Sequence, residues 1–85
     1  MCKTLEFIRV FKLEDTEVQY ESRIALDAAD IKGIEEYVID YLKSSEPLCY
    51  IHTYHGDCIV VKADFDYLLA IKKREDKNRL LYKFN

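Results

Sequence analysis

The first 24 residues contain two stretches in which apolar and polar side chains alternate. In residues 4–13 both sides of the stretch carry apolar residues, whereas residues 17–24 have one apolar and one polar side. A period of two is typical of β-strands, and a polar side indicates a strand with one solvated face. Residues 14–17 are all polar and separate the two stretches, so we predict a β-hairpin.

Apolar positions repeat at helical spacing between residues 27 and 43. Asp27 is a favourable N-cap residue, and Asp30 follows it in the position of a capping box. Residues 44–47 include two serines and a proline, which are typical of a helix end. The apolar stripe predicted for this helix consists of Ile31, Ile34, Val38, Tyr41 and Leu42.

A second hairpin is predicted for residues 48–55 and 58–63, which flank the turn signal Gly56-Asp57. A two-residue turn sorts the side chains of both strands into two faces. One face then carries Cys49, Ile51, Thr53, His55, Cys58, Val60 and Lys62. The other carries Tyr50, His52, Tyr54, Ile59, Val61 and Ala63. The pattern leaves open which of these two faces is buried.

The chain is predicted to end with a second helix and a short strand. Asp64 is a favourable N-cap, and Leu68, Leu69 and Ile71 form the apolar side of a helix. Asn78 is a plausible helix stop, and residues 80–84 are again apolar enough for a strand.

These elements define an α+β fold with the order β-β-α-β-β-α-(β). We expect a two-layer sandwich, with a mainly antiparallel sheet and two helices on one of its faces. Without the first strand, the order becomes β-α-β-β-α-β, which is that of a ferredoxin-like sheet. This order is shared by proteins with many functions and predicts none of them. A chain of 85 residues is expected to form one domain, residues 1–85.

Composition supports a folded cytoplasmic protein. Apolar residues make up 49% of the chain, with only two glycines and one proline, so disorder is not expected. Charges interrupt every apolar run, so neither a signal peptide nor a membrane span is predicted. Three unevenly spaced cysteines do not form a disulfide framework, which favours a reducing compartment.

The net charge of −3 is unevenly distributed. Residues 14–30 hold six acids and one base, and residues 67–85 hold six bases and two acids. The basic end predicts an alternative function, a small nucleic-acid-binding domain, because cations bind phosphates. The same cations would also stabilise the end of a helix through its dipole. The residues of this alternative site are Lys72, Lys73, Arg74, Lys77, Arg79 and Lys83.

Two cysteines and two histidines stand three residues apart in the second hairpin, at Cys49, His52, His55 and Cys58. Zinc sites need such side chains to converge on a tetrahedron. The predicted pleat places His52 on the opposite face from the other three, so we predict no metal site and no cofactor. A thiol or metal site at His55 and Cys58 remains a weaker hypothesis. His55, Asp57 and Cys58 contain the groups of a nucleophile site, but they crowd one turn and the sequence indicates no oxyanion hole or substrate cleft, so a catalytic triad is not expected.

Apolar residues on both faces of the strands indicate a surface that binds another protein. Two helices on one face of a sheet leave the other face uncovered, and an exposed apolar patch usually marks an interface. We therefore predict a non-enzymatic regulatory or inhibitory module that binds a protein partner, or itself as a homodimer through the open sheet face. Alternatively, residues 80–84 fold over this patch. The predicted binding residues are Tyr50, Ile51, His52, Tyr54, Val60, Ile8 and Val10.

Overall fold

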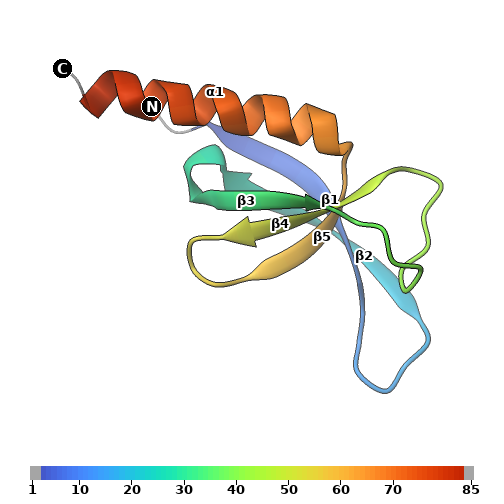
Figure 1. The fold of residues 1–85 in the computed structure, drawn as a ribbon. Helices are drawn as coiled ribbons and strands as arrows, with labels where there is room; N and C mark the ends of the chain where they lie inside the picture. The colour runs from blue at the N-terminus through green and yellow to red at the C-terminus, as the bar shows by residue number, and fades with distance from the viewer. Residues whose placement is uncertain (1–2, 84–85) are drawn as a thin grey trace.

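The computed structural model describes residues 3–83, and the side chains of residues 3–77. Five strands are followed by one long helix (Figure 1). A single turn of 3-10 helix, η1 (Ala28–Asp30), lies between the second and third strands. The remaining elements are β1 (Thr4–Lys12), β2 (Gln19–Asp27), β3 (Ile31–Glu36), β4 (Leu48–Thr53), β5 (Cys58–Lys62) and α1 (Phe65–Lys83).

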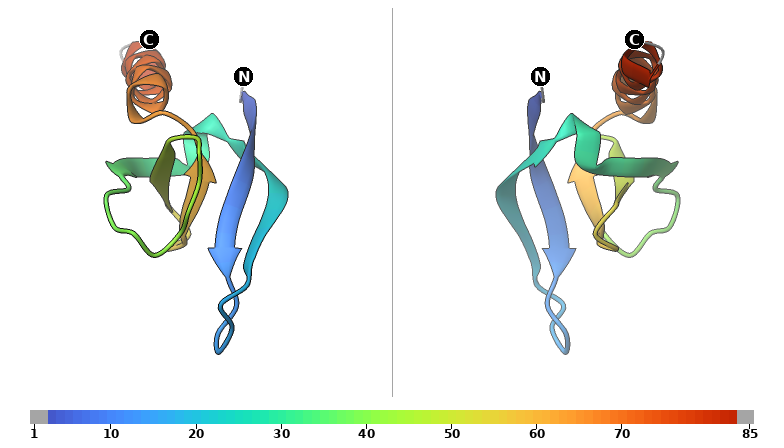
Figure 2. Two further views of the ribbon diagram at one scale, coloured as in Figure 1. Left: turned by 90° about the vertical axis from the view of Figure 1, so that its right-hand side faces the viewer. Right: turned by 90° about the vertical axis from the view of Figure 1, so that its left-hand side faces the viewer.

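All five strands belong to one antiparallel sheet with the order β2-β1-β5-β4-β3. The predicted hairpin of β1 and β2 is confirmed, and its register runs without interruption from Thr4 opposite Asp27 to Lys12 opposite Gln19. β3, β4 and β5 form a meander, and β5 pairs with β1 at Arg9 and Val61. Figure 2 shows that β1 and β2 run at a steep angle to β3, so the sheet is strongly bent.

The core lies on the inner side of this bend. β1 contributes Leu5 and Phe7, and α1 closes one end of the core with Leu68. The start of α1 predicted at Asp64 is confirmed, because the Asp64 carboxylate accepts a hydrogen bond from the Tyr67 N–H at 3.4 Å. The other buried members of the core are Ala28, Ile31, Cys49, Ile51, Ile59 and Val61.

The helix predicted for residues 27–43 is wrong. Asp27 precedes only the single turn η1 and makes no side-chain capping bond there; its carboxylate instead accepts a hydrogen bond from the Thr4 hydroxyl at 3.2 Å. Residues 31–36 form β3, which pairs with β4 through a register shift between Ile31 and Gly33. Residues 37–47 form a loop without helix or strand. Long-range pairing with β4 therefore overrides the local helical spacing.

The predicted fold class is therefore also wrong, because the described residues contain one α-helix rather than two on a common sheet face. The single helix continues past Asn78 to Lys83, so the strand predicted for residues 80–84 does not form over residues 80–83, and residue 84 lies outside the described residues. Within this helix the Lys72 amine bonds the Asp76 carboxylate one turn later at 2.8 Å, a pairing that favours helical structure. The coarser prediction of an α+β protein with an antiparallel sheet is confirmed.

The hairpin of β4 and β5 is confirmed, but Thr53 pairs with Asp57, so three residues, 54–56, separate the closing pair instead of two. Thr53 closes this turn: its N–H donates to the Asp57 carbonyl at 2.9 Å, and its hydroxyl accepts from the Asp57 N–H at 3.1 Å. Gly56 takes a positive φ of 94° within the turn. As a result, Cys58 lies opposite His52, and the predicted assignment of faces is wrong. The buried face consists of Cys49, Ile51, Thr53, Ile59 and Val61.

Replacement of Leu68 by alanine should lower the free energy of unfolding by about 2–4 kcal/mol, because it empties a fully buried site. Leu69→Ala, at a half-buried neighbouring position, should cost about 1 kcal/mol. Urea unfolding followed by circular dichroism measures both values. Equal losses for the two variants would contradict the observed orientation of α1.

Candidate protein-binding surface

The loop of residues 37–47 covers part of the outer face of the sheet. Val10, on the outer face of β1, is only 1% exposed, and Leu42 of the loop is also buried. The Tyr37 ring packs 5.1 Å from the Tyr50 ring of β4, and the Tyr37 hydroxyl accepts a hydrogen bond from the Leu42 N–H at 2.9 Å. The loop thus covers with its own apolar side chains a face that α1 leaves open.

Polar contacts fasten this loop to the start of β2. The Gln19 side chain donates to the Lys43 carbonyl at 2.6 Å and accepts from the Lys43 N–H at 2.8 Å. The Lys12 amine lies 4.4 Å from the centre of the Tyr41 ring, a cation–π contact. The loop is therefore fixed beside the tip of the β1–β2 hairpin, as Figure 1 shows.

Exposed large apolar side chains gather on this loop and on the adjacent hairpin tip. Val38 is the most exposed, at 79%. Figure 1 shows the tip projecting from the side of the molecule opposite α1. We call this region the hairpin–loop surface; its residues are Leu13, Val18, Val38, Ile39 and Tyr41. Exposed apolar clusters of this kind usually mark interaction sites.

Acidic side chains border the hairpin–loop surface. Glu14, Asp15 and Glu17 occupy the hairpin tip, and Asp40 lies within the loop; all four are exposed. The bases nearby are partly neutralised, since the Lys12 amine is 3.9 Å from Glu17 and that of Lys43 is 3.7 Å from Asp40. The border therefore carries negative charge, which attracts basic groups.

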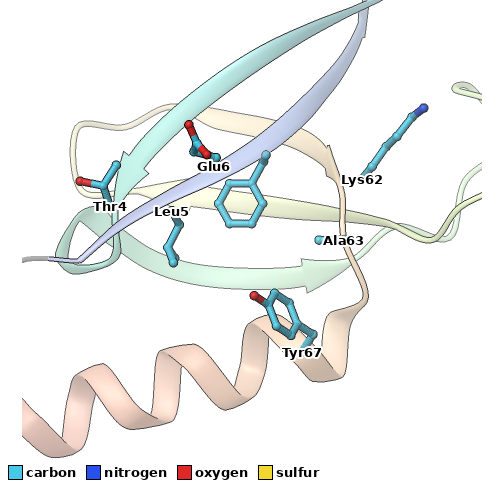
Figure 3. Close-up of a pocket in the computed structure, with 7 residues that line it drawn as sticks. Thr4, Leu5, Glu6, Lys62, Ala63 and Tyr67 are labelled. Atoms are coloured by element: carbon cyan, nitrogen blue, oxygen red, sulfur yellow. The ribbon is translucent and has the colours of Figure 1, made fainter.

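A separate hollow of about 610 Å³ lies between β1 and α1 (Figure 3). Tyr67 extends from α1 toward β1, and the titratable groups of β1 and β5 here are Glu6 and Lys62. Lys62 points away from Glu6 and instead bonds the Glu21 carboxylate at 2.7 Å, which is the main cause of the raised pKa of Lys62. This hollow brings no nucleophile and base together among the described residues.

The residues predicted to bind a partner are dispersed by the fold. Ile51 and Val10 are in the interior and are not available to a partner. Tyr54 is exposed in the turn between β4 and β5. The other four predicted residues are half-buried on the outer face: Ile8, Tyr50, His52 and Val60.

Sequence reasoning missed the most exposed part of the hairpin–loop surface. Helical spacing places Val38 and Tyr41 in the apolar stripe of a helix that does not form, and both are exposed in the loop instead. The signal that could have located them is Pro47 together with two serines, which allows a longer loop as well as a helix end.

The cysteines and histidines of the second hairpin do not converge. Cys49 is buried, its thiol donates to the Glu35 carbonyl at 3.3 Å, and burial raises its pKa. His52 faces Cys58 across the strands, contrary to the predicted pleat, and bonds the Glu35 carboxylate at 3.3 Å. His55 is exposed in the turn. Within residues 3–83, no three His, Cys, Asp or Glu side chains are grouped so that they could hold a metal ion.

The basic residues of the alternative site lie along α1. Lys72 is paired with Asp76, whereas Lys73, Arg74 and Lys77 are exposed. The side chains of Arg79 and Lys83 lie outside the described side chains. Over the part of the chain that the structure describes, no helix combines the length and apolar character needed to cross a membrane.

No protein-family model matches this chain, and no curated protein or solved structure is significantly similar to it.

Replacement of Gln19 by alanine removes both side-chain hydrogen bonds to Lys43. We expect the free energy of unfolding to fall by about 1–2 kcal/mol, because each bond contributes roughly 0.5–1.5 kcal/mol. Amide exchange at Leu42 and Lys43 should accelerate, as measured by hydrogen exchange in NMR spectra. Gln19→Glu keeps the acceptor and serves as the control; unchanged exchange in Gln19→Ala would show that the loop is held by other contacts.

The Cys58 thiol should react more slowly than an unperturbed cysteine, although it is exposed. Desolvation and the nearby Glu35 carboxylate raise its pKa, so less of the reactive thiolate is present at a given pH. Alkylation by iodoacetamide at pH 8, followed by mass spectrometry in a Cys2→Ser background, measures the rate. Glu35→Gln should accelerate the reaction, and a rate above that of free cysteine would instead favour a reactive thiol site.

Proposed function

We propose that this chain is a non-enzymatic protein-binding module that contacts its partner through the hairpin–loop surface. The observation that carries the proposal is the exposure of Val38, Ile39 and Tyr41 on a loop whose position is fixed. Gln19 holds this loop through hydrogen bonds to Lys43, and Lys12 holds it through a cation–π contact with Tyr41. A surface that is already ordered loses little conformational entropy when it binds. Its apolar residues supply contact area that water would otherwise cover.

The partner inferred from this chemistry is a protein with an apolar patch bordered by basic groups. Glu14, Asp15, Glu17 and Asp40 are placed to meet such groups around the apolar centre. Charges at the rim of an interface mainly raise the association rate and select among partners. By occupying a surface of this partner, the module would act as a regulatory or inhibitory subunit.

The outer sheet face that the sequence favoured is a poorer candidate for this contact. The 37–47 loop already buries Val10 and packs against Tyr50, so only part of that face remains accessible. The apolar residues of the loop itself replace it as the site. We therefore place the contact on the loop and the hairpin tip.

The basic helix gives less support to nucleic-acid binding. Glu75 and Asp76 interrupt the cations of α1, and Asp76 holds Lys72 in an ion pair at 2.8 Å. Neutralised cations contribute little to phosphate binding. Lys73, Arg74 and Lys77 remain exposed, but no aromatic platform or groove among the described residues accompanies them.

The double variant Val38→Asp/Ile39→Asp tests the proposal. The wild-type protein is first used to capture partners from its own cells, and a captured protein is then purified. Its affinity for both forms is measured by isothermal titration calorimetry. We expect binding to weaken by about tenfold or more, because two exposed apolar contacts are lost and acidic groups replace them.

Tyr67→Glu is the matched control, since it places a negative charge at an exposed aromatic position on α1. This variant should bind as tightly as the wild type. Circular dichroism must show that all three proteins are folded. Equal affinity of the wild-type and Val38→Asp/Ile39→Asp proteins would refute the hairpin–loop surface as the binding site.

A further inference from the structure

β2 is a long and regular strand at the edge of the sheet. Its nine residues contain neither glycine nor proline, and its register with β1 shows no bulge. β1 pairs with one side of β2, and no strand of the sheet pairs with the other side. Figure 2 shows no described helix or strand beyond β2 on this side of the molecule. An unpaired edge of this kind is a template for another strand.

The side chains of β2 leave room for such a neighbour. Residues 20–23 are all exposed, including those on the inner face of the strand. Tyr20 stacks on Phe11 at 5.9 Å and is still 40% exposed. A bulge and a proline, two devices that protect an edge strand, are absent from residues 19–27.

We propose that β2 pairs antiparallel with β2 of a second copy of this chain, with a two-fold axis between the two Ser22 residues. The axis is perpendicular to the local sheet, so each face of one strand continues into the same face of the other. The two sheets then join into one sheet across the axis. This inference is independent of the proposed function, because it uses neither Val38 nor Ile39.

Charge complementarity selects this register. With Ser22 on the axis, Glu21 lies directly opposite the partner's Arg23, and symmetry repeats the pair on the other side of the axis. Both side chains are exposed on the outer face. Opposite charges directly across an antiparallel pair are stabilising, and like charges are destabilising.

Neighbouring registers are worse for the same reason. Directly facing residues of two antiparallel strands have their side chains on the same side of the sheet. The two-fold axis must therefore lie between the two copies of one residue. An axis at Glu21 brings the two Glu21 carboxylates together, and an axis at Arg23 brings the two guanidinium groups together. An axis at Ile24 places Glu21 opposite the partner's Asp27. An axis at Ala25 also pairs opposite charges, Arg23 with the partner's Asp27, but it leaves Tyr20 without a facing residue of β2, and the Asp27 carboxylate already accepts a hydrogen bond from Thr4.

The inner face fits the same register. Tyr20 falls opposite the partner's Ile24, which is half-buried and packs against the core. Aromatic residues opposite β-branched residues are favourable cross-strand pairs. The exposed part of the Tyr20 ring would therefore be covered at the same register that pairs Glu21 with Arg23.

The existing ion pair of Glu21 is compatible with this contact. One oxygen of its carboxylate, Oε2, accepts from the Lys62 amine at 2.7 Å. A carboxylate has two oxygens and several acceptor positions, so it can accept from Lys62 and from the partner's Arg23 together.

A disulfide at the axis tests the pairing directly. In a Cys2→Ser/Cys58→Ser background, Ser22→Cys brings two thiols face to face. Directly opposite residues lie about 4.5–5.5 Å apart between Cα atoms, which suits a disulfide. Under mild air oxidation, a covalent dimer on a non-reducing gel should form about tenfold faster than in the Ala25→Cys control, whose cysteines lie far from the axis.

Charge variants of the Ser22→Cys protein separate specific pairing from random collision. Arg23→Glu should slow the crosslinking severalfold, because it places two acids opposite each other. Glu21→Arg/Arg23→Glu restores opposite charges without changing the net charge and should restore the rate. The proposal would be overturned if the covalent dimer formed no faster than in Ala25→Cys, or if its rate of formation were the same in both charge variants as in the Ser22→Cys protein. Neither result would bear on the hairpin–loop surface.

Discussion

Mutual burial of the two halves of the bent sheet is the constraint on which the structure depends. Leu5 and Phe7 of the first hairpin are covered by the same core that contains Ile51 and Val61 of the meander. A two-stranded hairpin is only marginally stable alone, so the first hairpin depends on the core that it shares with the meander. The pairing of β1 with β5 holds the halves in this arrangement.

One helix cannot cover both sides of such a sheet, and the 37–47 loop compensates on the outer side. Leu42 and Tyr37 face inward and bury Val10 and part of Tyr50. The same short segment has too few inward positions for all its apolar residues, so Val38 and Ile39 face solvent. The exposed surface is thus a by-product of the covering, and this connects the fold to the proposed binding site.

Alternation of side chains was sufficient to predict β1, β2, β4 and β5, because each strand is held by a neighbour that is close in sequence. β3 escaped the same reasoning, since Ile31 and Ile34 fit a helical spacing as well as a bulged strand. Asp27 also favoured the wrong prediction of a helix, because aspartate is a common N-cap residue, whereas in the structure its carboxylate bonds the Thr4 hydroxyl.

The candidate site was harder to predict than the fold. The faces of β4 and β5 depend on the length of one turn, and Thr53 closes a three-residue turn by bonding Asp57 through its backbone N–H and its hydroxyl. A change of this size moves Cys58 from one face to the other. The exposure of Val38 depends on contacts from Gln19 to Lys43, 24 residues apart, which no local pattern encodes.

The position of β1 also has a consequence for the way the chain folds. β1 is the first strand in sequence but an interior strand of the sheet, and its second neighbour, β5, begins only at Cys58. During synthesis, the first hairpin must wait with Leu5 and Phe7 uncovered until most of the chain has emerged. Closing so long a loop costs conformational entropy before the contacts of β1 with β5 form, which slows folding. The uncovered apolar side chains of the first hairpin then remain accessible for longer to aggregation and to chaperones.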